Sequence, residues 1–221
     1  MPAFHTPRDH LPAEFAVFPL SGALLLPRGK LPLNIFEPRY LAMIEDALAN
    51  RRMFAMVQPD PNAPPGEHGP GLYRVGCLGR LTSFSESDDG RFLITLTGLA
   101  RFAIAEELPN RRGYRRVRAD YSAYPADLDP NPDPTGVERE ALLIALKAYF
   151  AGQKFDANWE AVRRIPDESL VVTLSMICLF EPAEKQALLE APTEADRAAT
   201  LLTLLQMGAA GSDLPPGRQA S

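Results

Sequence analysis

The sequence predicts an α+β protein in which a β-rich part is followed by a helical part. Apolar residues recur at every second position in the first part and at every third or fourth position in the second. A proline-rich segment separates the parts, and proline suits neither a helix interior nor a central strand. The 221 residues, 46% of them hydrophobic, are enough to form a core without disulfides or metals. The expected organisation is a β-rich subdomain over residues 1–124, a linker over 125–134, a helical subdomain over 135–208 and a mobile tail over 209–221.

Alternating apolar residues predict the strands of the first part. Gly76 and Gly79 lie within one of these strands and predict a bulge or a sharp curve. Asp89-Gly90 is typical of a type I′ turn that joins two strands as a hairpin. The expected strands cover residues 14–20, 53–57, 73–84, 92–96, 100–105 and 114–121.

One helix is expected within the sheet, and several follow the linker. Pro38 has the fixed φ that suits a helix start, and Leu41, Ile44 and Leu48 form a single apolar stripe behind it. In the second part, Gly208 is expected to end the last helix. The starts of the later helices are expected at the capping pair Thr135 and Glu138, and at Asp156, Asp167, Pro182 and Thr193.

The charge and the cysteines limit the classes of partner and compartment. The net charge is −5, with +2 on residues 1–124 and −7 on residues 125–221, so neither part has the excess of a dedicated nucleic-acid binder. The two cysteines, Cys77 and Cys178, have neither a metal-ligand spacing nor the pattern of a disulfide framework. No secretion signal is visible and no apolar run is long enough to span a bilayer. We therefore expect a cytoplasmic protein without a membrane partner.

The sequence shows no constellation of catalytic residues. It contains no glycine-flanked nucleophilic serine, no phosphate-binding loop and no H-E-x-x-H motif. Its three histidines, His5, His10 and His68, lie in irregular, proline-rich stretches without ligand spacing. We therefore expect no enzymatic activity, no cofactor and no metal site.

The segment IFEPRY, residues 35–40, is the first local feature that could bind a ligand. Glu37 precedes the expected helix start, where a carboxylate can accept bonds from backbone N–H groups. The segment is therefore either a structural corner, with Glu37 as the cap and Tyr40 packed, or a site where Glu37 and Arg39 hold a ligand. The sequence leaves both interpretations open.

A basic hairpin, RRGYRRVR, is the second such feature. Its charged and aromatic side chains could grip an RNA backbone and stack a base. The same charges could instead protect an edge strand against aggregation. The residues of this anion or RNA patch are Arg111, Arg112, Tyr114, Arg115, Arg116 and Arg118.

Four segments in a fixed order carry a family resemblance: FPLSGALLLPRGKLPLNIFEPRYLAMIEDAL, YRVGCLGRLTSF, GRFLITLTGLARFAI and YRRVRADY. They resemble the N-terminal substrate-recognition domain of the Lon protease family, and more narrowly the bacterial members that consist of that domain alone. The likeness extends from about Glu14 to Met207. It implies a small, curved β-sheet or barrel of the PUA-like kind that holds one helix, followed by a helical subdomain.

The resemblance also implies a function. In Lon this domain contacts unfolded or tagged polypeptides, whereas the chain lacks Lon's phosphate loop and its Ser/Lys pair. It therefore implies a non-enzymatic module that binds exposed polypeptide segments, an adaptor for proteolysis or quality control whose partner is a protease or chaperone. We expect the site in the crevice between sheet and helices, near the loop of residues 59–70. RNA binding by the basic hairpin, on a PUA-like sheet, is the alternative. The expected polypeptide-binding residues are Pro32, Phe36, Glu37, Arg39 and Tyr40.

Overall fold

The computed structural model describes residues 11–129 and 136–211, and the chain forms two compact units. The first unit comprises Met1–Pro132 together with Met176–Glu190, and the second comprises Asp133–Ser175 together with Ala191–Ser221. The division differs from the expected boundaries, because residues 176–190 lie inside the stretch expected to be one helical subdomain. No helix in the described ranges is long and apolar enough to cross a membrane.

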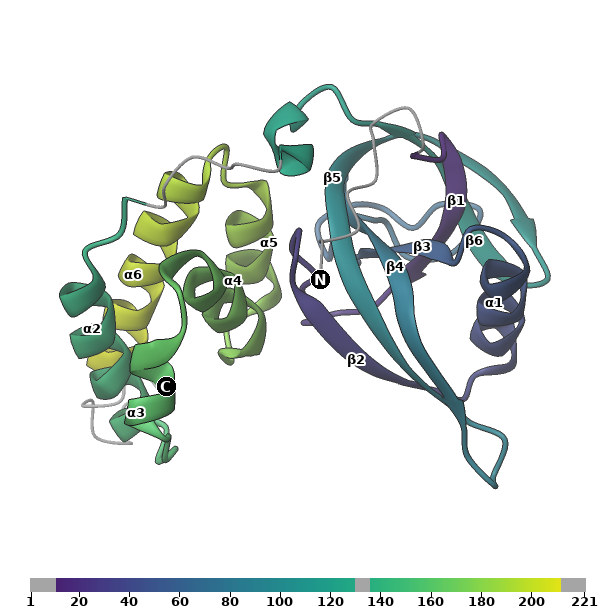
Figure 1. The fold of residues 1–221 in the computed structure, drawn as a ribbon. Helices are drawn as coiled ribbons and strands as arrows, with labels where there is room; N and C mark the ends of the chain where they lie inside the picture. The colour runs from purple at the N-terminus through teal and green to yellow at the C-terminus, as the bar shows by residue number, and fades with distance from the viewer. Residues whose placement is uncertain (1–10, 130–135, 212–221) are drawn as a thin grey trace, which may run out of the picture. The chain divides into compact units, whose positions relative to one another are not determined.

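One curved sheet builds the first unit (Figure 1). Its six strands are ordered β2-β5-β4-β3-β1-β6, and a further pairing of β5 with β6 closes five of them into a barrel. Neighbours are antiparallel except β1 and β3, which run parallel. The α+β prediction with a curved sheet is thus confirmed. The strands are β1 Glu14–Pro19, β2 Lys30–Ile35, β3 Met53–Val57, β4 Val75–Glu86, β5 Phe92–Arg111 and β6 Tyr114–Asp120.

Two of the expected strands are one in the structure. Residues 92–96 and 100–105 both belong to β5, a continuous strand of 20 residues. Its first part pairs with β2 and β4, and its last part pairs with β6. The strand bends across the barrel (Figure 1). The predicted irregularity in β4 is confirmed by a register shift between Leu78 and Gly79. A Cβ at Gly79 would lie 2.4 Å from Leu96, so the bend leaves no room for a side chain there.

Apolar side chains from five strands fill the barrel. Phe15 and Phe102 meet edge to face, with ring centroids 4.9 Å apart. Helix α1, Pro38–Ala49, begins at the predicted proline. Of its predicted stripe, Ile44 is fully buried, while Leu41 and Leu48 lie half-buried at the margin. Tyr40, Ala42, Met43 and Ala47 complete the buried face.

Two segments from the expected linker and helical parts belong to the first unit. The 3-10 helix η2, Pro125–Leu128, is held by a buried ion pair in which Asp127 accepts three hydrogen bonds from the side chain of Arg101 and one from its backbone N–H. Helix α5, Pro182–Glu190, starts at the predicted proline and is fixed by Gln186, which hydrogen-bonds to Gln58 and to the carbonyl of Val75. The start of the predicted linker is thus ordered.

The second unit contains four helices among its described residues: α2 Arg139–Gly152, α3 Trp159–Arg164, α4 Asp167–Ile177, whose last two residues fall in the first unit, and α6 Glu194–Gly211. Thr193 caps α6 as predicted, because its hydroxyl accepts from the N–H of Asp196. The cap of α3 is Asn158 rather than the predicted Asp156, which bonds to Ala157 instead.

Three other predictions for the helix ends differ from the structure. Glu138 precedes α2 without a side-chain capping bond, and its predicted partner Thr135 lies outside the described residues. Asp167 is the first residue of α4 rather than its cap. Helix α6 runs through Gly208, where a Cβ would lie 2.7 Å from the ring of Tyr149, so this glycine permits close helix packing and does not end the helix. Of the predicted tail, residues 209–211 are helical and 212–221 lie outside the described residues.

Candidate functional site

The IFEPRY corner joins β2 to α1 and presents most of its side chains to solvent. Phe36 is 61% exposed, and the guanidinium of Arg91 lies over its ring, 5.7 Å from the centroid. Glu37 stands at the N-cap but its carboxylate makes no capping bond, because it pairs with Arg39 at 2.9 Å. Pro32 is exposed on β2, whereas Tyr40 is buried. The corner thus combines a packed tyrosine with accessible neighbours.

Beyond the barrel, three strands continue as a ribbon formed by residues 30–36, 81–86 and 91–97, here called the β2–β5–β4 ribbon. Strand β2 pairs with β5 alone among the described strands, and Pro32 removes one backbone donor from its outer edge. Leu93, opposite Asn34, is 47% exposed. Phe84, on the other face, packs against Phe92 and is still 40% exposed. The ribbon therefore shows large apolar side chains on both faces.

The basic hairpin joins β5 to β6, and all its arginines are paired with carboxylates. Tyr114 is buried, and its hydroxyl donates a 2.6 Å hydrogen bond to Asp46 of α1. Each arginine of the hairpin thus has at least one carboxylate partner. The pairs are Arg111 with Asp46, Arg112 with Glu45 and Asp46, Arg115 with Glu107, Arg116 with Glu14, and Arg118 with Glu14 and Glu106.

These pairs change the titration of the groups that fix the hairpin to α1. The hydrogen bond from Tyr114, together with the nearby arginines, lowers the pKa of Asp46 below its ordinary value. Burial and the bond to Asp46 raise the pKa of Tyr114 to about 12. At neutral pH the carboxyl group is therefore charged and the phenol neutral, the combination that the hydrogen bond requires.

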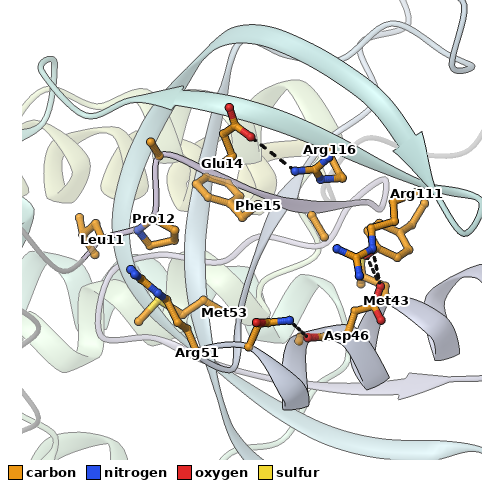
Figure 2. Close-up of a pocket in the computed structure, with 15 residues that line it drawn as sticks. Leu11, Pro12, Glu14, Phe15, Met43, Asp46, Arg51, Met53, Arg111 and Arg116 are labelled. Carbon is orange, nitrogen blue, oxygen red and sulfur yellow. Dashed lines mark hydrogen bonds and ion pairs between the residues drawn. The ribbon is translucent and has the colours of Figure 1, made fainter.

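A large hollow lies between β1, α1 and β6 (Figure 2). Its volume is about 580 Å³, within the range of ligand pockets. Phe15, Met43 and Met53 give it an apolar lining. Its rim carries two ion pairs, Arg111 with Asp46 at 3.1 Å and Arg116 with Glu14 at 3.5 Å. We call this the rim-paired hollow, since these opposite charges already face each other.

A smaller hollow of about 220 Å³ lies on the other side of Tyr114. Its lining residues come from the end of β1, the first turn of α1, the loop after β3 and the β5–β6 turn. Arg39 and Tyr40 of the IFEPRY segment thereby meet Tyr114 and Arg115 of the basic hairpin. We call it the arginine–tyrosine pocket. Its lining residues are Pro19, Arg39, Tyr40, Pro59, His68, Pro70, Asn110, Gly113, Tyr114 and Arg115.

Several of these residues were not predicted from the sequence. Phe84 and Leu93 are missed because each lies in a strand, where an apolar residue usually indicates the core. His68, Asn110 and Gly113 lie in loops, and only the fold brings them beside α1. The loop of residues 59–70, expected near a crevice between sheet and helices, contributes Pro59, His68 and Pro70 to this pocket. Across the ranges that the structure describes, no three His, Cys, Asp or Glu side chains are grouped to hold a metal ion.

Comparisons with known proteins all find similarity to Lon proteases. The family described as "ATP-dependent protease La (LON) substrate-binding domain" matches residues 14–207. Lon protease 1 of Bdellovibrio bacteriovorus is 27% identical over 199 residues, which cover 86% of this chain and 24% of that protein. The Lon protease of Elusimicrobium minutum is 25% identical over 209 residues, or 88% of this chain and 24% of that protein. The shares of the curated relatives that the chain spans run from 12% to 24%.

Two solved structures share the fold. The Lon N-terminal domain protein from Xanthomonas campestris superposes with a TM-score of 0.55 at 20% identity, covering 86% of this chain and 97% of that chain. The N-terminal domain of the Mycobacterium avium complex Lon protease gives 0.60 at 17% identity, covering 89% and 98%. At these identities the likeness concerns the fold alone.

Proposed function

This chain belongs to the family of ATP-dependent protease La (LON) substrate-binding domains, and on that premise we propose that it binds exposed apolar segments of other polypeptides. The observation that carries the proposal is the β2–β5–β4 ribbon, where Phe36, Phe84 and Leu93 are exposed at the ends of adjacent strands. Large apolar side chains exposed close together mark an interaction site more often than single ones do, and here Leu93 and Phe84 offer one contact on each face of the ribbon. The predicted residues Pro32 and Phe36 both belong to this ribbon.

The expected affinity is modest. Burying one side chain of this size contributes about 1.5–3 kcal/mol. Association costs at least about 4 kcal/mol in lost freedom of motion. A few such contacts therefore give a micromolar affinity or a weaker one, which suits repeated, short-lived contacts with unfolded chains.

We propose further that the chain acts without an enzymatic step, as an adaptor for proteolysis or quality control with a protease or chaperone as partner. The match to a substrate-binding domain supports this role. We place it in the cytoplasm, a compartment with which two buried cysteines that form no disulfide are compatible.

A titration of the protein into a fluorescently labelled, permanently unfolded polypeptide with an amidated C-terminus tests the proposal. Phe36→Ser and Leu93→Ser should each weaken binding about tenfold, or about 1.4 kcal/mol, because each removes one apolar contact. Ile144→Ser is the matched control, since Ile144 is 69% exposed on α2 of the second unit. Unchanged affinity in both ribbon variants, with unchanged melting temperatures, would contradict the proposal.

RNA binding by the basic hairpin is disfavoured, because Arg111, Arg112, Arg115, Arg116 and Arg118 are all paired with carboxylates. A labelled RNA in the same titration checks this. Binding that falls steeply with salt and is lost in Arg112→Ser and Arg116→Ser would favour the alternative.

A further inference from the structure

Basic side chains, those of two arginines and one histidine, line the arginine–tyrosine pocket without a lining carboxylate. Arg39, His68 and Arg115 line it, and no Asp or Glu does. The carboxylates that pair with the two arginines, Glu37 and Glu107, lie outside the lining. Both guanidinium groups thus have their charge balanced from outside the pocket while they present N–H donors to it.

Arg115 is anchored with hydrogen-bonding capacity to spare. Its side chain is 8% exposed, and it donates through Nε and Nη2 to Glu107 and through Nη1 to the carbonyl of Pro70. A guanidinium carries five N–H donors, and these bonds use three of them. One N–H on each terminal nitrogen therefore has no acceptor among the described residues.

Tyr40 presents a second polar group in the same situation. The residue is 6% exposed and its ring packs on Phe18, with centroids 4.2 Å apart. Its hydroxyl lines the pocket and has no hydrogen-bond partner in the described part of the chain. Burial raises the pKa of Tyr40, so the group stays a neutral O–H donor at physiological pH. Both groups therefore offer the pocket a donor that no described residue accepts, and an acceptor from outside can bind there in place of water.

Arg39 completes the pocket at its exposed side. Its guanidinium lies 4.6 Å from the ring centroid of Tyr40. Gly113 allows this approach, because a Cβ at Gly113 would already lie 3.3 Å from the Cβ of Arg39. The exposed guanidinium of Arg39 and the buried guanidinium of Arg115 thus both line this pocket.

We infer that the arginine–tyrosine pocket binds the C-terminal carboxylate of a polypeptide. A carboxylate is a planar acceptor that matches guanidinium and hydroxyl donors. A volume of about 220 Å³ takes the end of a chain rather than a segment that passes through. The inference rests on the proposed polypeptide binding and adds a preference for chain ends to it.

The test uses the full chain and an N-acetylated tripeptide, with a free C-terminus or as the amide, followed by NMR chemical shifts. The free acid should bind about tenfold more tightly than the amide, the contribution of one charge-assisted hydrogen bond, and should shift the amide signal of Gly113. Tyr40→Phe and Arg39→Gln should each reduce this preference. Arg118→Gln removes the same charge outside the pocket and should keep it.

Three outcomes would overturn the inference: equal binding of acid and amide, no binding of the acid at millimolar concentration, or an unchanged preference in both pocket variants. Displacement of the acid by inorganic phosphate at a lower concentration than by acetate would also overturn it, because the site would then be selective for phosphate. The amidated polypeptide of the preceding section lacks the carboxylate, so its binding to the ribbon reports separately on the proposed function.

Discussion

The two hollows described in the first unit share Tyr114 but differ in whether carboxylates stand among their lining residues. The larger, rim-paired hollow has about 580 Å³, yet its rim charges face each other as Arg111 with Asp46 and Arg116 with Glu14. The smaller arginine–tyrosine pocket has about 220 Å³ and is lined by Arg39 and Arg115 but not by their partners Glu37 and Glu107, and its Tyr40 hydroxyl has no acceptor among the described residues. The comparison teaches that the groups lining a hollow, and not its volume alone, determine which ligands it can accept.

The largest effect is expected where a matched charge is fully buried. Asp127→Ala leaves the guanidinium of Arg101 buried without its carboxylate, and both side chains are 3% exposed. Breaking such a pair costs about 3–5 kcal/mol of unfolding free energy. Urea unfolding measures it. Asp89→Ala is the control, because its pair with Arg91 is about half exposed and should contribute little to stability. Equal, small losses in both variants would contradict the buried pairing.

An intermediate effect separates the two tyrosines. Tyr114→Phe removes a hydrogen bond to the Asp46 carboxylate and should cost about 1.5–3 kcal/mol. Tyr40→Phe removes a hydroxyl without a partner among the described residues, and should change stability by at most about 0.5 kcal/mol. Urea unfolding of both variants measures the difference. Similar losses would mean that the Tyr40 hydroxyl is already satisfied within the protein, and the contrast between the two hollows would disappear.

The smallest effect concerns pH. The Tyr114 hydrogen bond and the adjacent arginines lower the folded-state pKa of Asp46 below 3.8. The unfolded chain therefore binds the proton more readily, so this stabilisation is present above about pH 4 and is lost as the pH falls through the folded-state pKa. Unfolding free energies from pH 6 to pH 3 should fall less in Asp46→Asn than in the natural protein. Parallel curves would show that Asp46 does not titrate as described.

Periodicity predicts most of the fold because each predicted element follows from neighbours in the sequence. Pro38 and Pro182 begin helices, and Thr193 caps one, since each acts within a single turn. The prediction that Gly208 ends a helix is wrong because the reason for this glycine lies far away in the sequence. The ring of Tyr149 packs where a side chain at position 208 would be. Sequence spacing also cannot show that β5 continues through residues 97–99 while changing partners.

The site was predictable only in fragments. The composition of IFEPRY and of the basic hairpin indicates each segment separately as a candidate site. Only the fold brings the two segments together in one pocket, which is lined by Arg39, Tyr40, Tyr114 and Arg115. Whether a given arginine is matched depends on carboxylates up to 104 positions away, as Glu14 is from Arg118. Charge pairing of this kind is a property of the folded chain, and no local pattern carries it.

The return of helix α5 to the barrel has a consequence for biosynthesis. Gln58 of the barrel donates to the carbonyl of Pro182, and Arg101 donates to the carbonyl of Leu189. Both acceptors belong to residues that are translated long after β6, so neither hydrogen bond can form until then. A nascent chain that has delivered all six strands from the ribosome still lacks part of its first unit. Most of the second unit's residues must be synthesised before the first can be finished, so the first unit cannot complete its folding as soon as its strands have been translated.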